Sequence, residues 1–377
     1  MSDAAPDAIR PSRFQRLVLP GLAFKAVVIG GGYATGREIA EFFLPAGAWG
    51  GLAAMALATA IWSAVCVATF LFARMAAARD YRGFFQALLG RGWVVFEFAY
   101  MLFVVLVLAV FGAAAGEIGH ATLGLPRLAG TAALMACIAT VAAFGNHSVE
   151  RLFAWVSILL YGVYILFAIF ALSAFGDRIG TAFAGPVTMS TDWAGGGLTY
   201  AGYNIVGAVI ILPVLRHLTS DRDAVVAGLA AGPLAMLPAL VFFVCMTGFM
   251  PAIAGEALPS DYLLARLGHP WFRYLFQLMI FAALLESGTG AVHAINERVA
   301  GAWHARGRTL TPVQRGAGAL VLLALCMLAA ERVGLVALIA GGYRLLAWVV
   351  LAVYVVPLMT LGVWRLLHRP SRPPEPA

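Results

Sequence analysis

Long apolar stretches, each near the length needed to cross a bilayer, recur along the whole chain. Only 11% of the residues are charged, 62% are hydrophobic, and the mean hydropathy is +0.90. A soluble domain has roughly 25% charged residues, so this chain lacks the polar groups to cover a water-exposed surface. A bilayer accepts apolar side chains on every face of a helix. The sequence therefore predicts an all-α integral membrane protein embedded in a lipid bilayer.

The apolar runs predict ten spans, because a helix needs roughly 20 residues to cross the hydrocarbon core. The predicted spans are 17–44, 49–74, 93–116, 128–145, 152–175, 194–216, 224–250, 271–298, 314–330 and 344–366. Residues 80–89 are predicted to form a short amphipathic helix on the membrane surface. The stretch 334–342 is apolar but too short to span, which indicates a re-entrant or interfacial segment.

Basic residues are distributed unevenly between alternate loops, with 17 on one side of the predicted spans and 6 on the other. Cytoplasmic loops hold the excess of Lys and Arg, so both termini are predicted to be cytoplasmic. This bias accounts for the net charge of +7 without a nucleic-acid partner. We expect residues 1–16 to form a cytoplasmic tail and residues 367–377 a disordered one. Scarce Lys beside abundant Arg, Ala and Gly favours a bacterial inner-membrane protein.

Ten spans divide into two five-helix halves, expected at residues 17–175 and 176–366. The first span of each half contains a glycine interruption with polar residues at mid-depth. In the first span it comprises Gly30, Gly31, Gly32 and Gly36, and in the sixth it covers residues 200–207. Interrupted spans at matching positions of two inverted halves are typical of transporter binding sites, because unpaired backbone groups need a cavity or a ligand. The alternative is close helix packing through small residues.

Residues 27–39, with the sequence VVIGGGYATGREI, resemble the first span of the YkvI-like family of amino acid permeases, in the amino acid–polyamine–organocation superfamily. Tyr203 and Asn204 are similar to an aromatic–Asn pair of the same family, whereas Arg37 stands where Gln is more usual. The resemblance implies the LeuT-type fold, a 5+5 inverted repeat with helices 1 and 6 broken. It also implies transport of a small amino acid or amine as substrate.

By this analogy the substrate site is formed at the two interruptions. The expected substrate-binding residues are Gly30, Gly31, Gly32, Tyr33, Thr35, Gly36, Tyr203 and Asn204. For Asn204 the alternative is an interhelical hydrogen bond that only holds the structure.

A polar stripe follows one face of the eighth span, with Glu286, Thr289 and His293 at helical spacing. Ionisable groups inside a membrane indicate function, or else a static ion pair. In the resembled fold, spans 1 and 8 meet at the coupling-ion site, so Lys25 and Glu286 are expected to pair there. The expected ion-coupling residues are Lys25, Glu38, Glu286, Ser287, Thr289 and His293.

Two coupling ions remain open. A carboxylate with hydroxyl groups suits Na⁺, whereas an ammonium at the same place favours coupling to H⁺ through Glu286 or His293. In the outer part of the first span, Arg37 and Glu41 are spaced to pair with each other.

No other cofactor and no metal site is expected, because the four cysteines lie in separate apolar runs without a C-x-x-C pair. The sequence also lacks the H-E-x-x-H and G-x-S-x-G motifs of enzymes. The leading interpretation is an ion-coupled carrier, not an enzyme. A ligand-binding sensor of the same fold is the main alternative, and a membrane-embedded enzyme or a channel is less favoured. The oligomeric state is left open.

Overall fold

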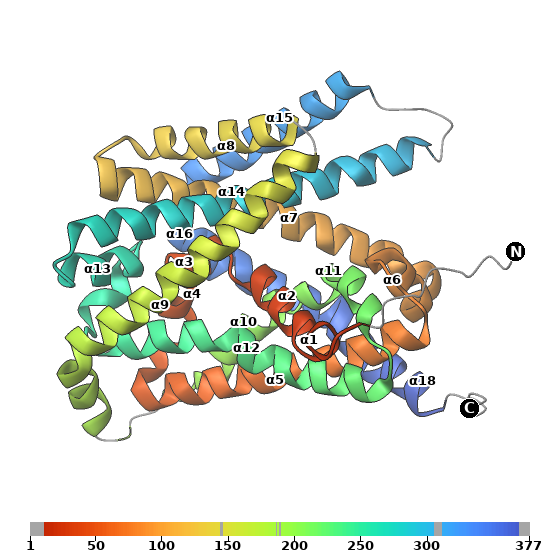
Figure 1. The fold of residues 1–377 in the computed structure, drawn as a ribbon, viewed down its shortest axis with the longest axis horizontal. Helices are drawn as coiled ribbons and strands as arrows, with labels where there is room; N and C mark the ends of the chain where they lie inside the picture. Colours follow the sequence, from red (N-terminus) through yellow and green to blue (C-terminus); the bar gives the residue numbers. More distant parts are fainter. Residues whose placement is uncertain (1–10, 144–145, 186, 188–189, 305–310, 369–377) are drawn as a thin grey trace, which may run out of the picture.

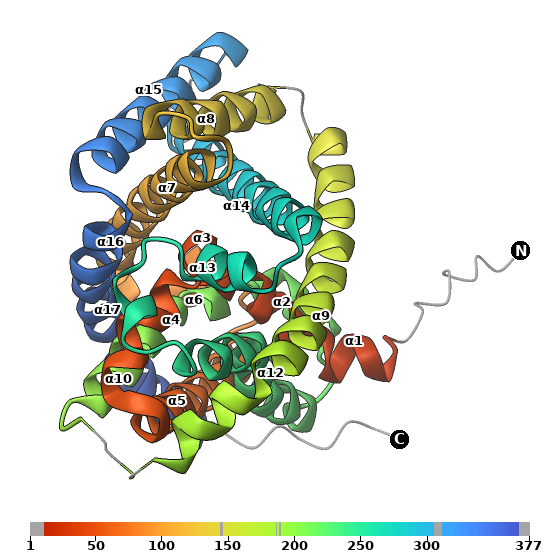
Figure 2. The same ribbon diagram turned by 90° about the vertical axis from the view of Figure 1, so that its left-hand side faces the viewer.

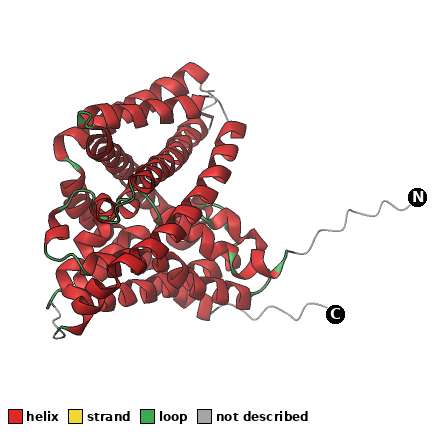
Figure 3. Cartoon of the chain, turned by 60° about the vertical axis from the view of Figure 1, so that its left-hand side comes forward, coloured by secondary structure: helices red, strands yellow, loops and turns green. Residues whose placement is uncertain are grey.

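The computed structural model describes residues 11–143, 146–185, 187, 190–304 and 311–368. These residues form helices joined by short loops, and no strand occurs among them (Figure 3). Of the predicted tails, residues 1–10 and 369–377 lie outside the described residues. The remainder of the first tail is largely helical, because a capping box at Ser12 begins a short helix at Arg13.

The helices up to residue 184 include the predicted surface helix and five predicted spans. They are α1 (Arg13–Leu17), α2 (Leu19–Val28), α3 (Gly31–Ala34), α4 (Arg37–Phe42), the 3₁₀ turn η1 (Leu44–Ala46), α5 (Gly47–Met75), α6 (Tyr81–Leu89), the 3₁₀ turn η2 (Gly90–Gly92), α7 (Trp93–Leu123), α8 (Arg127–Ala143) and α9 (Asn146–Ala184). The predicted short amphipathic helix is thus confirmed as α6, whose apolar face buries Phe84, Phe85 and Leu88, while its place on the membrane surface stays a prediction.

The helices after residue 190 again mix long and short elements. They are α10 (Trp193–Asn204), α11 (Gly207–Ile210), the 3₁₀ segment η3 (Leu212–His217), α12 (Asp221–Thr247), the 3₁₀ segment η4 (Ala252–Gly255), α13 (Pro259–Arg266), α14 (Pro270–His304), α15 (Pro312–Val333), α16 (Leu335–Ala337), the π-helical η5 (Leu338–Tyr343), α17 (Arg344–Val350), the π-helical η6 (Leu351–Val355) and η7 (Leu358–Gly362), and α18 (Val363–Leu367).

Seven helical stretches of the described chain are long and apolar enough to cross a membrane, which makes this a multi-pass membrane protein. They are Arg37–Met75, Tyr81–Leu123, Leu159–Ala184, Asp221–Thr247, Pro270–Ala300, Gly316–Val333 and Leu335–Leu367. Predicted spans 1 and 6 are absent from this set because each is divided into short helices. Predicted span 4 corresponds to α8, which is 17 residues long. The count of ten therefore stays a prediction.

The expectation of a separate re-entrant segment at 334–342 is wrong. Gly334 ends α15, and the next helix begins at Leu335 and runs to Leu367 without a break. The glycines at 341 and 342 do not interrupt it, because Gly342 packs directly against the Leu106 side chain of α7. The last span therefore begins about two turns earlier than predicted.

The helices form two groups with the broken first span between them (Figure 2). In one group α5 packs against α10 and α12, and in the other α7 and α8 pack against α14 and α15. Helices α9 and α17 connect the groups, since α9 contacts α12 and α14 while α17 contacts α7 and α10. Helices α6 and α18 lie at one end of the molecule and α13 at the other (Figure 1). This arrangement places α2, α3 and α4 in the centre.

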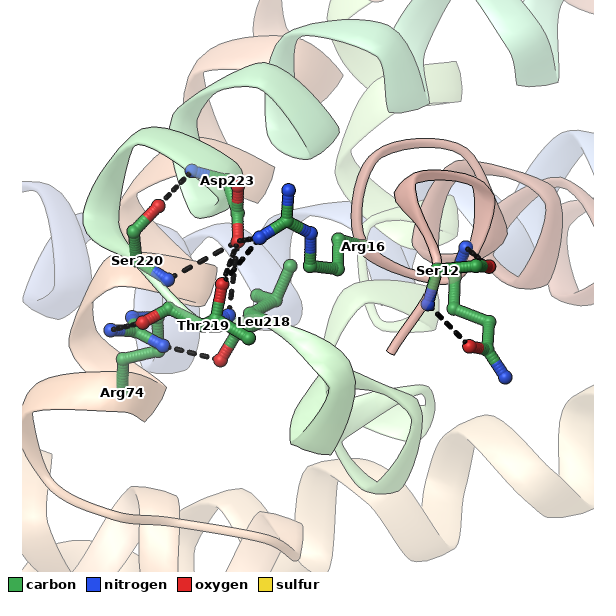
Figure 4. Close-up of polar contacts among 8 residues, drawn as sticks. Ser12, Arg16, Arg74, Leu218, Thr219, Ser220 and Asp223 are labelled. Carbon is green, nitrogen blue, oxygen red and sulfur yellow. Dashed lines mark hydrogen bonds and ion pairs between the residues drawn. The ribbon is translucent and has the colours of Figure 1, made fainter. Parts of the chain in front are cut away.

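The N-terminus of α12 is tied to α1 and α5 by polar contacts (Figure 4). Ser220 and Asp223 form a capping box that begins the helix. Arg16 of α1 donates to Thr219 Oγ1 at 2.8 Å and lies 3.6 Å from Asp223 Oδ2. Arg74, in the last turn of α5, donates to the carbonyl oxygens of Leu218 and Thr219. Three elements are thereby fastened together at this end of the bundle.

Candidate functional site

The first span is interrupted twice rather than once. Helix α2 ends at Val28, and Ile29 has φ −74° and ψ 78°, outside the helical region. Gly31 and Gly32 then belong to the short helix α3, and a second interruption follows at Thr35 and Gly36. The prediction of one break at Gly30, Gly31 and Gly32 is therefore corrected: Gly30 lies at the first interruption, and the next two glycines are helical.

Gly36 has a left-handed backbone, with φ 78°, and directly precedes α4. This conformation costs an L-residue roughly 1–2 kcal/mol, whereas glycine adopts it freely. A Cβ atom at this position would also lie 2.5 Å from Met246 Cε of α12. The local sequence therefore accounts for the second interruption, which separates α3 from α4.

The sixth span is interrupted within the predicted segment 200–207. Helix α10 ends at Asn204, and α11 begins at Gly207. Around this point the amides of Ala208 and Val209 donate to carbonyls three residues back, at 2.9 and 3.1 Å. Pro213 follows in η3, where the helix is of the tighter 3₁₀ type. The predicted sixth span thus changes from α-helical to 3₁₀ hydrogen bonding at the expected segment, while Ile205 and Val206 keep right-handed helical backbone angles.

A buried carboxyl group joins the two interrupted spans. Glu38 of α4 is 3% exposed, and the Tyr203 hydroxyl of α10 donates to its Oε2 atom at 2.5 Å. The carboxyl group folds back over α3, where a Cβ atom on Gly32 would lie 2.2 Å from Glu38 Oε1. The backbone amide of Tyr33 is a second hydrogen-bond partner. Gly32 is therefore required for close approach to Glu38.

Five tyrosines surround this carboxyl group, and we call them the tyrosine cage. All are buried, and the Glu38 carboxylate interacts electrostatically with each of them: Tyr33, Tyr164, Tyr200, Tyr203 and Tyr343. Tyr343 stacks on Tyr203 with ring centres 4.4 Å apart, and Tyr200 meets Tyr203 edge-on at 5.8 Å. The hydroxyls of Tyr164 and Tyr200 are buried without a partner among the described residues.

Thr35 and Asn204 make local hydrogen bonds. Thr35 Oγ1 donates to the Gly32 carbonyl at 3.0 Å, and Asn204 Nδ2 donates to the Tyr200 carbonyl at 3.2 Å. These bonds satisfy carbonyls next to the two interruptions. The Tyr33 hydroxyl reaches the Ala235 carbonyl of α12 at 3.4 Å.

The segment around α13 covers one end of the first span. The Ser260 amide donates to the Thr35 carbonyl at 2.9 Å. Arg37 donates to the carbonyls of Ala254 and Glu256 at 2.7 and 3.0 Å and pairs with Glu41 at 2.6 Å. The predicted pairing of Arg37 with Glu41 is confirmed. The only basic side chain adjacent in sequence to Glu38 thus points away from it, towards η4.

A small cavity of about 50 Å³ lies between α2, α9 and α14. It is lined by Ile29 at the first interruption, by Tyr161, and by Glu286 and Ser287. Lys25 Nζ lies over the Tyr161 ring, 4.2 Å from its centre. The expected ion pair between Lys25 and Glu286 is not present among the described contacts, because the ammonium packs on the intervening aromatic ring. The two groups nevertheless share Tyr161 as a neighbour.

Thr289 and His293 occupy different surroundings. Thr289 is fully buried, and its hydroxyl has no partner within the described part of the chain. His293 is exposed. The stripe expected along the eighth span therefore does not face one cavity. Thr289 is rotated about 60° from Glu286 around the helix, and His293 lies about 10 Å further along it.

No family model matches the sequence, and no curated protein matches it. The structure, in contrast, is similar to solved structures. It aligns with MhsT in complex with L-phenylalanine at a TM-score of 0.61 and 17% identity, over 94% of this chain and 97% of MhsT. It aligns with Mhp1 in an inward-facing conformation at a TM-score of 0.51 and 15% identity, over 97% of this chain and 90% of Mhp1.

This chain has the LeuT-type fold. The comparisons bear out this expected fold over nearly the whole chain, whereas the ten helices and the 5+5 inverted repeat stay predictions. Membership of the YkvI-like family is a separate question, which no sequence match addresses.

The sequence interpretation missed part of the tyrosine cage. Tyr343 lies between the predicted re-entrant stretch 334–342 and the predicted last span 344–366, and Tyr164 lies one turn beyond Tyr161 on α9. A mid-span tyrosine is a weak signal by itself. The available clue was that several such residues occur at similar depth beside one mid-span glutamate.

Proposed function

We propose that this protein is an ion-coupled secondary transporter that moves a small organic solute, an amino acid or an amine, by alternating access. One observation is central to the proposal: the buried Glu38 carboxyl group joins the two interrupted helices through Tyr203. Such interruptions leave backbone groups that are tolerated in a membrane only beside a cavity or ligand. The fold is shared with MhsT, whose structure contains bound L-phenylalanine.

The finer arrangement belongs to the same proposal. We infer ten spans in two inverted halves, residues 17–175 and 176–366, with α2–α4 and α10–α11 as corresponding broken helices. The excess of basic residues supports cytoplasmic termini in a bacterial inner membrane. The sequence pattern around Tyr33 supports membership of the YkvI-like permeases.

Access from the two ends would be controlled by two sets of contacts. At one end, Arg37 and Ser260 fasten the α13 segment to the first span. At the other, Arg16 fastens α1 to the start of α12. Arg37 is 5% exposed and Ser260 is fully buried, so the contacts at the first end are costly to break, whereas Arg16 at the second end is partly exposed.

The cavity at Glu286 is the proposed coupling site. It adjoins Ile29 at the first interruption, so a change in its charge acts directly on the broken helix. We favour H⁺ as the coupling ion, bound at Glu286, because the residues that line the cavity include one carboxylate and only two with side-chain hydroxyls, Ser287 and Tyr161. Na⁺ is the alternative, with backbone carbonyls completing its shell.

The test is transport by the purified protein in proteoliposomes. Labelled L-phenylalanine and a panel of amino acids and amines are offered under an imposed pH gradient or an imposed Na⁺ gradient. We expect concentrative uptake with one of the two gradients, lost in Glu38→Gln and retained in Glu117→Gln. Glu117 is a suitable control because it pairs with Arg127 at the far end of α7. Binding without uptake under either gradient would instead establish the sensor alternative.

A further inference from the structure

Within the described part of the chain, Glu38 is buried without the positively charged partner that a carboxylate with a purely structural role needs. Burying an ionised carboxylate is costly unless a cation or several hydrogen bonds compensate it. Among the described ion pairs none includes Glu38, and the neighbouring Arg37 is engaged with Glu41 and η4. The carboxyl group therefore lacks an internal counter-ion.

The tyrosine cage has the properties of a cation site. The faces of aromatic rings attract ammonium groups by roughly 0.5–2 kcal/mol each when the ion is desolvated. The buried rings of the cage come from four elements, and Tyr203 contacts Glu38 directly: Tyr33 on α3, Tyr164 on α9, Tyr200 and Tyr203 on α10, and Tyr343 on η5. Two of them, Tyr164 and Tyr200, also have buried hydroxyls with no partner in the described residues. These hydroxyl oxygens can accept hydrogen bonds from N–H groups of a ligand.

The same surroundings disfavour an anion. Among the described residues, no Lys, Arg or His forms an ion pair with Glu38 or a cation–π contact with a tyrosine of the cage. The backbone amide of Tyr33, in the short helix α3, is already hydrogen-bonded to Glu38. A substrate carboxylate would thus meet a second carboxyl group, no cation from the described residues, and an amide that is already hydrogen-bonded. Like charges at a shared buried site repel each other strongly.

Phe42 separates this cage from a larger pocket. Its ring lies 6.2 Å from the Tyr200 ring and 5.9 Å from the Tyr203 ring, centre to centre. On its other side Phe42 lines a pocket of about 440 Å³ between α4, α10 and α17. Phe42 is therefore shared by the pocket and the cage, which places the pocket next to the tyrosines.

We propose that the substrate is an organic amine in its cationic form, whose ammonium group pairs with Glu38 inside the tyrosine cage. This inference rests on the proposed transport function and narrows its substrate class. When the site is empty, the Tyr203 hydroxyl donates a hydrogen bond to the Glu38 carboxyl group. The ammonium group of the substrate replaces the hydroxyl as the donor when it binds. A carboxylate on the ligand is not needed and weakens binding.

Matched ligands test the proposal on the full-length protein in detergent, by thermal stabilisation and by isothermal titration calorimetry at one pH. The probes are three sets of an amine, its α-amino acid and the amino-free acid: phenethylamine with L-phenylalanine and 3-phenylpropionate, tryptamine with L-tryptophan and 3-indolepropionate, and isoamylamine with L-leucine and 4-methylvalerate. We expect at least one amine to bind more tightly than its amino acid. The amino-free acids should not bind.

Substitutions then test whether the preference for amines depends on the Glu38 carboxylate. Glu38→Gln keeps the shape of the side chain and an acceptor for Tyr203, and should weaken binding of the amine about 100-fold or more, as for other buried charge pairs. Tyr203→Phe keeps the ring and the carboxylate, and should change the affinity less than about tenfold. Glu117→Gln should leave it unchanged.

Three results would overturn the inference. They are tighter binding of an amino acid than of its amine, undiminished amine binding by Glu38→Gln, and failure of every amine to bind. Transport of an amino acid in the same experiments would leave the proposed transport function intact. Absence of both binding and transport for all probes would count against both.

Discussion

Replacement of Gly32 by Ala tests the position of Glu38 directly. The added Cβ atom would lie 2.2 Å from Glu38 Oε1, 2.7 Å from Cγ and 2.8 Å from Cδ. Ordinary contact begins at 3.4 Å, so the carboxyl group would have to move by about 1.2 Å. Because three of its atoms are too close, rotation about the last bond cannot relieve the overlap. The hydrogen bond from Tyr203, now 2.5 Å long, would be broken.

The expected cost follows from these two effects. Overpacking a buried site costs about 1–3 kcal/mol, and leaving the Tyr203 hydroxyl buried without its partner costs about 1–3 kcal/mol. The two overlap, and alanine regains up to about 1 kcal/mol of helix propensity. We expect Gly32→Ala to lower the free energy of unfolding by about 2–4 kcal/mol and to abolish substrate binding.

Gly176→Ala is the matched control, because Gly176 lies within α9 with no atom within 4 Å of the added Cβ. Both variants are purified in the same detergent and compared by thermal unfolding monitored with size-exclusion chromatography. The control should be as stable as the parent protein or slightly more stable. If Gly32→Ala unfolds at the same temperature as the control and still binds substrate, Glu38 does not fold back over α3 and the site is wrongly placed.

Three further substitutions test other contacts. Glu286→Gln should lose uptake driven by a pH gradient but keep substrate exchange between equal pools, since only the coupling proton is removed; unchanged gradient-driven uptake in proteoliposomes would exclude Glu286 as the carrier. Arg273→Lys should destabilise the protein by about 1 kcal/mol. Arg273 donates to both carboxylate oxygens of Asp261, at 2.6 and 2.7 Å, and lysine cannot contact both. Equal thermal stability of the variant would refute this. Thr69→Val should cost about 1–3 kcal/mol, since it removes the 2.5 Å hydroxyl contact with buried Tyr354; an unshifted unfolding transition would show that this contact contributes nothing.

The membrane-spanning helices and the broken first span could be predicted because they depend on local properties of the chain. A run of apolar residues predicts a span whatever it packs against, and four glycines within seven residues predict an interruption. The errors in detail have local physical causes. Gly31 and Gly32 are helical because the strain is taken by Ile29 and by the left-handed Gly36. The glycines at 341 and 342 leave their helix intact because it packs against α7.

The site depends on contacts that no local pattern encodes. Glu38 and Tyr203 are 165 residues apart in sequence, and their hydrogen bond exists because both spans are interrupted at the same depth. From sequence alone Glu38 was grouped with the ion-coupling residues, since an intramembrane carboxyl group suggests ion binding. The structure instead separates two acidic positions: Glu38 lies in the tyrosine cage, and Glu286 lies in a small cavity beside Ile29. Both adjoin the broken first span, at opposite sides of α3. In the proposed mechanism, this separation would let one carboxyl group hold a substrate ammonium while the other holds a proton, and movement of the short helix between them would couple the two.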